Sequence, residues 1–141
     1  MNQNVKIFTV AALVSLQAVT VCDIATITCH DLHEQMQLAI SKRADLYVIN
    51  VLPKKICADC NIAGTINIPF HQLAKKVINW PKDRKIVVHC AGQQCPLGRH
   101  AYHQLRELGF VNVRLFEGGL RVWKSNNLPT KGACRAGYLK G

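Results

Sequence analysis

The chain has 141 residues, a formal net charge of +10 and 49% hydrophobic residues. This length suits one domain with a sizeable core, and the hydrophobic content excludes an intrinsically disordered chain. The basic residues are scattered, with no basic helix and no interleaved aromatic residues. We therefore expect no nucleic-acid binding, and we expect the positive charge to attract anionic substrates.

Residues 1–22 have the pattern of an export signal. Lys6 is the only charged residue before Asp23, and residues 7–21 are mostly apolar. This run is shorter than the roughly 20 residues of a membrane span. We expect a periplasmic or secreted protein if the signal is used, a cytoplasmic one otherwise, and no stable membrane insertion after processing. An uncleaved apolar segment that packs on the domain is the alternative, and the cleavage site is left open.

Apolar runs and periodic patterns alternate along the rest of the chain. The helix at 29–42 begins with Thr28 and Asp31, which resemble a capping box. The other expected elements are strands near 25–27, 46–51, 65–68, 86–88 and 111–115, and helices near 73–78, 101–108 and 118–123. A long polar connection covers 52–63, and the tail at 132–141 has no periodic pattern. Such alternation predicts one α/β domain over 23–131, with a mainly parallel sheet and helices on both faces.

Seven cysteines are many for this length, and their number is odd. They are Cys22, Cys29, Cys57, Cys60, Cys90, Cys95 and Cys134. The count alone is compatible with a disulfide framework, a metal site or reactive thiols, and it leaves at least one thiol unpaired in a monomer.

Cys90 follows the buried strand at 86–88 and begins a polar loop that leads into a helix. Backbone N–H groups and the positive end of the helix should ease ionisation of a thiol placed there. We therefore predict that Cys90 is a nucleophile, with a packed core thiol as the alternative. His89 should point away from the loop, because side chains alternate along a strand.

The loop after Cys90 is the predicted substrate site. Its backbone N–H groups are expected to form an anion cradle, and Gly92 allows a conformation that a side chain would hinder. Arg99, in the first helical turn, is expected to attract an anionic donor, with a solvated surface residue as the alternative. The predicted binding residues are Ala91, Gly92, Gln93, Gln94, Cys95 and Arg99.

Four stretches resemble the sequence motifs of rhodanese-like domains. They are Asn61–Pro69, Val87–Cys90, Leu105–Val113, and Glu117–Leu120 with Trp123 and Leu128–Pro129. They occur in the family's order across residues 26–130. The resemblance implies a five-stranded, mainly parallel sheet and a sulfurtransferase that carries sulfur as a persulfide on Cys90. It implies a donor such as thiosulfate or a polysulfide, a thiol or other thiophilic acceptor, and no cofactor. It indicates no particular protein partner.

Two departures from the family pattern are specific to this chain. Asn50-Val51-Leu52 stands where the family usually has Asp-x-Arg, and the loop is longer, with a Cys-x4-Cys spacing from Cys90 to Cys95. These departures favour an alternative, a non-catalytic binding or thiol-redox module that uses Cys90 and Cys95. The sequence disfavours a phosphatase of related topology, because the arginine that such an enzyme has six positions after the cysteine is here Pro96.

Cys95 has three interpretations from the sequence. It is a redox partner that resolves a modified Cys90, a passive thiol in the pocket, or a zinc ligand together with Cys57, Cys60 and Cys90. The long spacing disfavours zinc, and we predict no metal. Cys60 is a second candidate redox partner of Cys90. If the chain is exported, a local Cys57–Cys60 disulfide is the alternative.

Overall fold

The computed structural model describes residues 23–140, so the expected export signal lies outside the described residues. Its helices are α1 (Cys29–Lys42), α2 (Lys54–Asp59), α3 (Phe70–Val77), α4 (Leu97–Glu107) and α5 (Gly119–Ser125). Its strands are β1 (Leu46–Asn50), β2 (Asn61–Ile62), β3 (Ile66–Asn67), β4 (Lys85–His89), β5 (Val113–Phe116) and β6 (Thr130–Lys131). A 3-10 helix, η1 (Gly137–Leu139), lies near the end of the tail.

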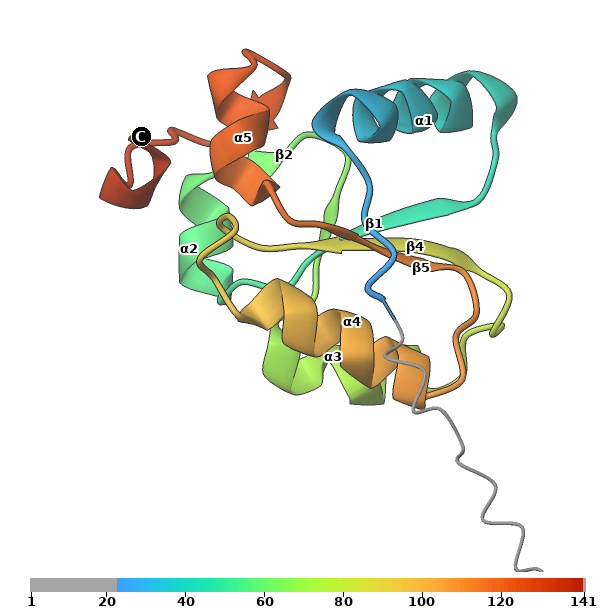
Figure 1. The fold of residues 1–141 in the computed structure, drawn as a ribbon. Coiled ribbons are helices and arrows are strands. Elements are labelled where there is room, and N and C mark those ends of the chain that lie inside the picture. Colours follow the sequence, from blue (N-terminus) through green and yellow to red (C-terminus); the bar gives the residue numbers. More distant parts are fainter. Residues whose placement is uncertain (1–22, 141) are drawn as a thin grey trace, which may run out of the picture.

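The central sheet has the strand order β3-β1-β4-β5, and all of its pairings are parallel. Helices α1 and α5 cover one face, and α3 and α4 cover the other (Figure 1). This confirms the predicted α/β class. In place of the expected first strand, Thr26 forms a single parallel bridge with Leu115. The described sheet therefore has four strands and one bridge at the β5 edge, where five strands were expected.

The first helix has the predicted bounds, and its beginning is set by Thr28. The Thr28 hydroxyl accepts a hydrogen bond from the Asp31 N–H at 3.1 Å. This bond satisfies one of the N–H groups that a helix start leaves unpaired. Leu32 and Met36, one turn apart, are buried against the sheet. The N-terminal cap and the apolar spacing together explain why this helix is readable from the sequence.

Strands β1 and β4 form the centre of the core. Ile49 and Val88 are fully buried, and Val48, Ile86 and Val87 are exposed by at most 3%. Continuous aliphatic runs are typical of parallel strands covered on both faces. Asn50 at the end of β1 is in register with His89 at the end of β4. The carboxyl ends of these strands therefore meet at one edge, where the loop after Cys90 begins.

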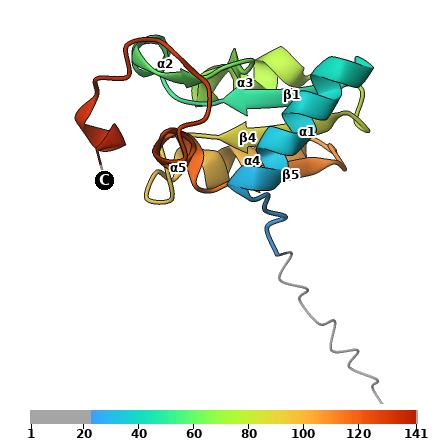
Figure 2. The same ribbon diagram turned by 90° about the horizontal axis from the view of Figure 1, so that it is seen from above.

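Two predicted loops contain structure. The expected connection at 52–63 contains α2, whose first turn is closed by N–H groups of Ile56 and Cys57 donating to the Pro53 carbonyl. A six-residue helix is too short to show an apolar period. The tail after β6 packs on the domain beside α5 and ends with Leu139 buried (Figure 2). Within residues 23–140, none of the helices is long and apolar enough to cross a lipid bilayer.

Candidate functional site: the thiols of the loop between β4 and α4

Cys90 lies at the carboxyl end of β4, with its side chain turned into the loop that leads to α4. The residue is only 3% exposed. Its thiol donates to the carbonyl oxygen of Cys95 at 3.3 Å and lies 3.7 Å from that of Gly92. A Cβ at Gly98 would lie 3.3 Å from the Cys90 sulfur, so the absence of a side chain there lets α4 begin against the thiol. The thiol is therefore enclosed by the loop and the first turn of α4.

The ionisation of Cys90 differs from the prediction. Burial raises the pKa of the Cys90 thiol to about 12, assisted by a hydrogen bond with the Cys95 side chain and by the charge of that side chain when ionised. Hydrogen bonds from the backbone N–H groups of Gly92 and Gly98 act in the opposite direction but are weaker. The expected cradle of N–H groups is thus mixed with carbonyl groups, which stabilise the protonated thiol. The role of Cys90 as a nucleophile stays a prediction.

The loop is fixed from the other side by the beginning of α5. The Leu120 N–H donates to the Cys90 carbonyl at 3.0 Å, and the Arg121 N–H donates to the Ala91 carbonyl at 2.9 Å. Gly119 makes this approach possible, because its φ is +57° and a Cβ there would lie 2.5 Å from the Cys90 carbonyl oxygen. Gly119 therefore has a direct role in positioning the loop.

Cys95 lies near the end of the same loop and is half-buried. Its N–H donates to the Gly92 carbonyl at 3.0 Å, which uses one of the expected cradle groups within the loop. Gln93 and Gln94, at the tip, are exposed. The Cys90 thiol donates to the Cys95 carbonyl, and both cysteines are free thiols. The loop thus brings the predicted thiol pair together.

His89 is fully buried behind Cys90 and packs near Phe116, with ring centroids 6.5 Å apart. Its Nδ1 lies 3.3 Å from the Cys90 carbonyl oxygen, and its Nε2 has no hydrogen-bond partner among the described residues. Burial lowers the pKa of His89 to about 4, so the ring is neutral at pH 7. It is a packed histidine, as the strand alternation predicts.

Arg99 projects from the first turn of α4 and forms an ion pair with Glu117. Both residues line a small space beside Cys90, of about 10 Å³, together with Gly98 and Phe116. The guanidinium group predicted to attract a donor is therefore already paired with a carboxylate. Neither Phe116 nor Glu117 was among the predicted site residues, although Glu117 opens one of the quoted motifs.

A second cavity, of about 240 Å³, is bordered by the loop, by α5 and by the tail. Its lining residues are Ala91, Gly92, Gln93, Gln94, Cys95, Arg121 and Tyr138. The Arg121 Nε donates to the Tyr138 carbonyl at 3.2 Å, which joins α5 to the tail at this wall. Burial and the nearby charges of Asp59, Cys57 and Cys95 raise the pKa of Tyr138. Sequence reasoning missed both wall residues, and no pattern in the tail marks Tyr138.

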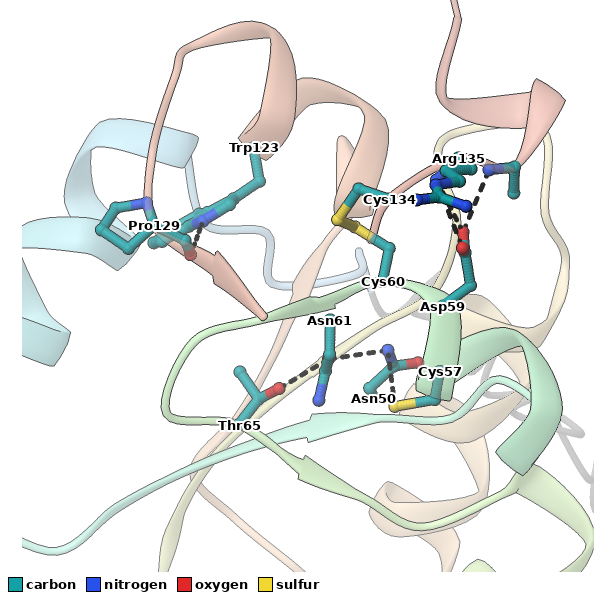
Figure 3. Close-up of a disulfide and its surroundings, with 11 residues drawn as sticks. Asn50, Cys57, Asp59, Cys60, Asn61, Thr65, Trp123, Pro129, Cys134 and Arg135 are labelled. Carbon is teal, nitrogen blue, oxygen red and sulfur yellow. Dashed lines mark hydrogen bonds between the residues drawn. A yellow bond between two sulfur atoms is a disulfide. The ribbon is translucent and has the colours of Figure 1, made fainter. Parts of the chain in front are cut away.

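The tail is held by a disulfide between Cys60 and Cys134, which are 74 positions apart (Figure 3). The Asp59 carboxylate reinforces it by accepting hydrogen bonds from the N–H groups of Arg135 at 3.1 Å and Ala136 at 3.0 Å. The predicted Cys57–Cys60 disulfide is therefore wrong, because Cys57 remains a free thiol 3.6 Å from the Asn50 amide nitrogen.

The same disulfide changes two further expectations. Cys60 is already oxidised, so it does not serve as a redox partner of Cys90 in this state. It also supplies none of the four thiolates that the zinc alternative required. Within residues 23–140, no group of three or more His, Cys, Asp or Glu residues is placed to hold a metal ion.

A neutral amide network stands where the family usually has a buried charge pair. Asn50 is fully buried, and its Nδ2 donates to the Asn61 Oδ1 at 2.9 Å. The Asn50 Oδ1 accepts a hydrogen bond from the Leu52 N–H at 2.9 Å. Thr65 donates to the Asn61 Oδ1 at 2.8 Å (Figure 3). These bonds satisfy the buried polar groups without any charge, so the end of β1 is held in place without an arginine.

A larger cavity, of about 480 Å³, lies at the opposite end of the sheet. It is bordered by α1 and by the beginnings of β1, β4 and β5, at Leu38, Leu46, Lys85 and Val113. None of the described residues that line it is a cysteine or histidine. Reactive groups of parallel sheets lie at the carboxyl ends of the strands, so the thiol pair marks the better candidate despite its smaller cavities.

The comparisons with known proteins agree with this geometry. Residues 32–126 match the model of the rhodanese-like domain. The chain belongs to the rhodanese-like family. It is 23% identical over 96 residues to a sulfurtransferase of Allochromatium vinosum, covering 68% of this chain and 88% of that protein. It is also 28% identical over 94 residues to the HTH-type transcriptional regulator Rv0324 of Mycobacterium tuberculosis, covering 67% of this chain and 41% of the regulator.

Solved structures show the same rhodanese-like fold. The Alr3790 protein of Anabaena is 26% identical, with a TM-score of 0.67 and coverage of 75% of this chain and 91% of that one. The thiosulfate sulfurtransferase of Pseudomonas aeruginosa is 25% identical, with a TM-score of 0.66, covering 77% of this chain and 20% of that one. The matched segment ends before Cys134, so the disulfide-held tail lies outside the part that defines the family.

Proposed function

We propose that the protein is a sulfurtransferase that moves sulfane sulfur from an anionic donor, such as thiosulfate or a polysulfide, to a thiol or other thiophilic acceptor. The family role in sulfur transfer is supported by the matched domain and by the sulfurtransferase of Allochromatium vinosum. The observation that carries the proposal is the position of Cys90, at the carboxyl end of β4 where the loop to α4 begins.

In the proposed reaction, the sulfur is held as a persulfide on Cys90. With thiosulfate as the donor, a thiolate forms a bond to the sulfane sulfur while the bond to the sulfonate sulfur breaks, and sulfite leaves with the electron pair. The N–H groups of Gly92 and Gly98 face the Cys90 sulfur and are the donors available to the anionic persulfide. An acceptor thiolate then takes the terminal sulfur and restores Cys90.

The test is a sulfur-transfer assay with the full chain. Thiosulfate and polysulfide are each supplied with a thiophilic acceptor, and the sulfur transferred is measured for wild type, Cys90→Ser and Cys29→Ser. We expect transfer by wild type and by Cys29→Ser, because Cys29 is a free thiol at the start of α1 that lines neither cavity beside the loop. We expect loss of transfer in Cys90→Ser. Equal transfer by Cys90→Ser overturns the proposal.

A thiol-redox module is the second candidate, and the presence of two free thiols, Cys90 and Cys95, in one short loop supports it. An oxidant would remove two electrons and two protons from the pair and join the two sulfur atoms. Counting free thiols before and after oxidation tests this function. A reversible Cys90–Cys95 disulfide without any sulfur transfer favours the redox module over the sulfurtransferase.

We also propose that the chain is exported, as residues 1–22 suggest. The Cys60–Cys134 disulfide supports this, since disulfides persist mainly in oxidising compartments. Cell fractionation with thiol alkylation at lysis tests it. A cytoplasmic protein with a reduced Cys60–Cys134 pair contradicts export.

A further inference from the structure

Two cavities of very different size meet at Cys95. Cys90 lines the inner space of about 10 Å³ but does not line the outer cavity of about 240 Å³. Cys95 lines both. Among the described cysteines, it is the one that lines the outer cavity and also accepts the hydrogen bond of the Cys90 thiol, through its carbonyl oxygen.

The sizes decide what each cavity can hold. The inner space is about the volume that one water-sized atom needs, so it admits a single atom but not a thiosulfate ion. The outer cavity has room for such an ion, and Arg121 provides a guanidinium group at its wall. The remaining wall is formed by residues 91–95 of the loop and by Tyr138 from the tail. A donor therefore fits next to Cys95, and only its sulfur atom fits next to Cys90.

The protonation of Cys90 agrees with this order. Cys90 donates its S–H to the Cys95 carbonyl, and burial raises the pKa of Cys90 to about 12, so it stays protonated near neutral pH. A protonated thiol is a poor nucleophile toward a free donor. Cys95 is half-buried and lies at the larger cavity, where a donor arrives first.

We propose that Cys95 takes sulfur from the donor in the outer cavity and passes it to Cys90. This inference rests on the proposed sulfurtransferase function. The Cys95 thiolate forms a bond to the sulfane sulfur, and the bond from that sulfur to the rest of the donor breaks. With thiosulfate, sulfite is the leaving group. The outer cavity therefore selects a small anionic donor, and Cys95 is a catalytic residue.

In the second step, the Cys90 sulfur bonds to the terminal sulfur of the Cys95 persulfide, whose bond to Cys95 breaks. The S–H proton of Cys90 passes to the departing Cys95 sulfur. The products are a Cys90 persulfide anion and a Cys95 thiol, so charge and atoms balance. No electrons are gained or lost overall, and the relay needs no oxidant or reductant.

The experiment follows persulfide formation residue by residue. Wild type, Cys95→Ser, Cys90→Ser and the control Cys29→Ser are mixed with thiosulfate, trapped with iodoacetamide at successive times, and analysed by peptide mass spectrometry. Far-UV circular dichroism first confirms that each variant is folded. We expect Cys95→Ser to load Cys90 at least about ten-fold more slowly than wild type. We expect Cys90→Ser to retain sulfur on Cys95, and Cys29→Ser to behave as wild type.

The outcomes separate the relay from the proposed function. Two results overturn the transfer of sulfur from Cys95 to Cys90 but leave the proposed sulfurtransferase function standing. One is loading of Cys90 at the wild-type rate in Cys95→Ser, and the other is a Cys90→Ser protein without sulfur on Cys95. A wild-type protein that gains no sulfur on either residue overturns both. Alkylation of the resting protein by iodoacetamide is an independent readout without a donor: the relay predicts faster modification of Cys95, and faster modification of Cys90 contradicts it.

Discussion

Gly119, the first residue of α5, lies directly against the carbonyl group of Cys90. A Cβ at Gly119 would lie 2.5 Å from the Cys90 carbonyl oxygen and 2.7 Å from the Gly92 nitrogen. Both atoms belong to the backbone, so neither can move aside as a side chain would. The position of the reactive loop therefore depends on the absence of a side chain at a residue 29 positions later in the sequence.

Gly119→Ala is expected to displace the loop and slow the loading of Cys90. The substitution combines the strain of a positive φ with a backbone clash, and we expect it to destabilise the fold by about 2 kcal/mol or more. Gly109→Ala is the matched control, because Gly109 also has a positive φ, +91°, but has open space where the Cβ would be. It should lower stability by only about 1 kcal/mol and leave loading unchanged. Urea unfolding and timed persulfide analysis measure both effects, and equal loading by the two variants contradicts the positioning role.

Cys134→Ser is expected to destabilise the protein by about 2–4 kcal/mol, because the lost cross-link closes a long loop and restricts the unfolded chain. Dithiothreitol should lower the urea midpoint of wild type and leave that of Cys134→Ser unchanged. Cys29→Ser removes a free thiol and should keep the sensitivity to reductant. A wild-type urea midpoint that stays unchanged after complete reduction of the disulfide contradicts this stabilising role.

Stability is expected to fall between pH 6.5 and pH 4 because of His89. Its folded pKa of about 4 lies below its ordinary value of 6.5, so the unfolded chain binds a proton in this range and the folded protein does not. The contribution of His89 is complete above pH 6.5 and decreases as the pH falls toward 4, by about 3 kcal/mol in total. Urea unfolding at pH 7 and pH 4.5 measures the loss.

Two histidine variants test whether His89 causes this pH dependence of stability. His89→Gln should reduce it, whereas His103→Gln, at an exposed position on α4, should keep it. A titration of the His89 ring by NMR reports its pKa directly. A midpoint near 6.5 for His89 contradicts the account.

Local patterns in the sequence predicted much of the fold. The apolar spacing and the Thr28 cap defined α1, and the aliphatic runs located β1 and β4. Helix α2 was missed because six residues after Pro53 show no period. The partner of Cys60 lies 74 positions away, and such a pairing cannot be read from local spacing.

The candidate site was predicted only in part. Cys90 and Cys95 lie in one loop as predicted, because both belong to one short segment. The raised pKa of Cys90 was not predicted, since it depends on burial and on the carbonyls that the folded loop turns toward the sulfur. Arg121 and Tyr138 come from other segments, and only the folded chain brings them to the outer cavity.

The measurement that tests the central claim most directly is the mass of the peptide containing Cys90 after incubation with thiosulfate or a polysulfide. The protein is purified without added metal and kept in its folded form, and excess donor is removed before trapping. The account predicts a mass increase of one sulfur atom located on Cys90, reversed by a thiophilic acceptor and absent in Cys90→Ser. A Cys90 that stays unmodified in the folded wild-type protein with both donors contradicts it.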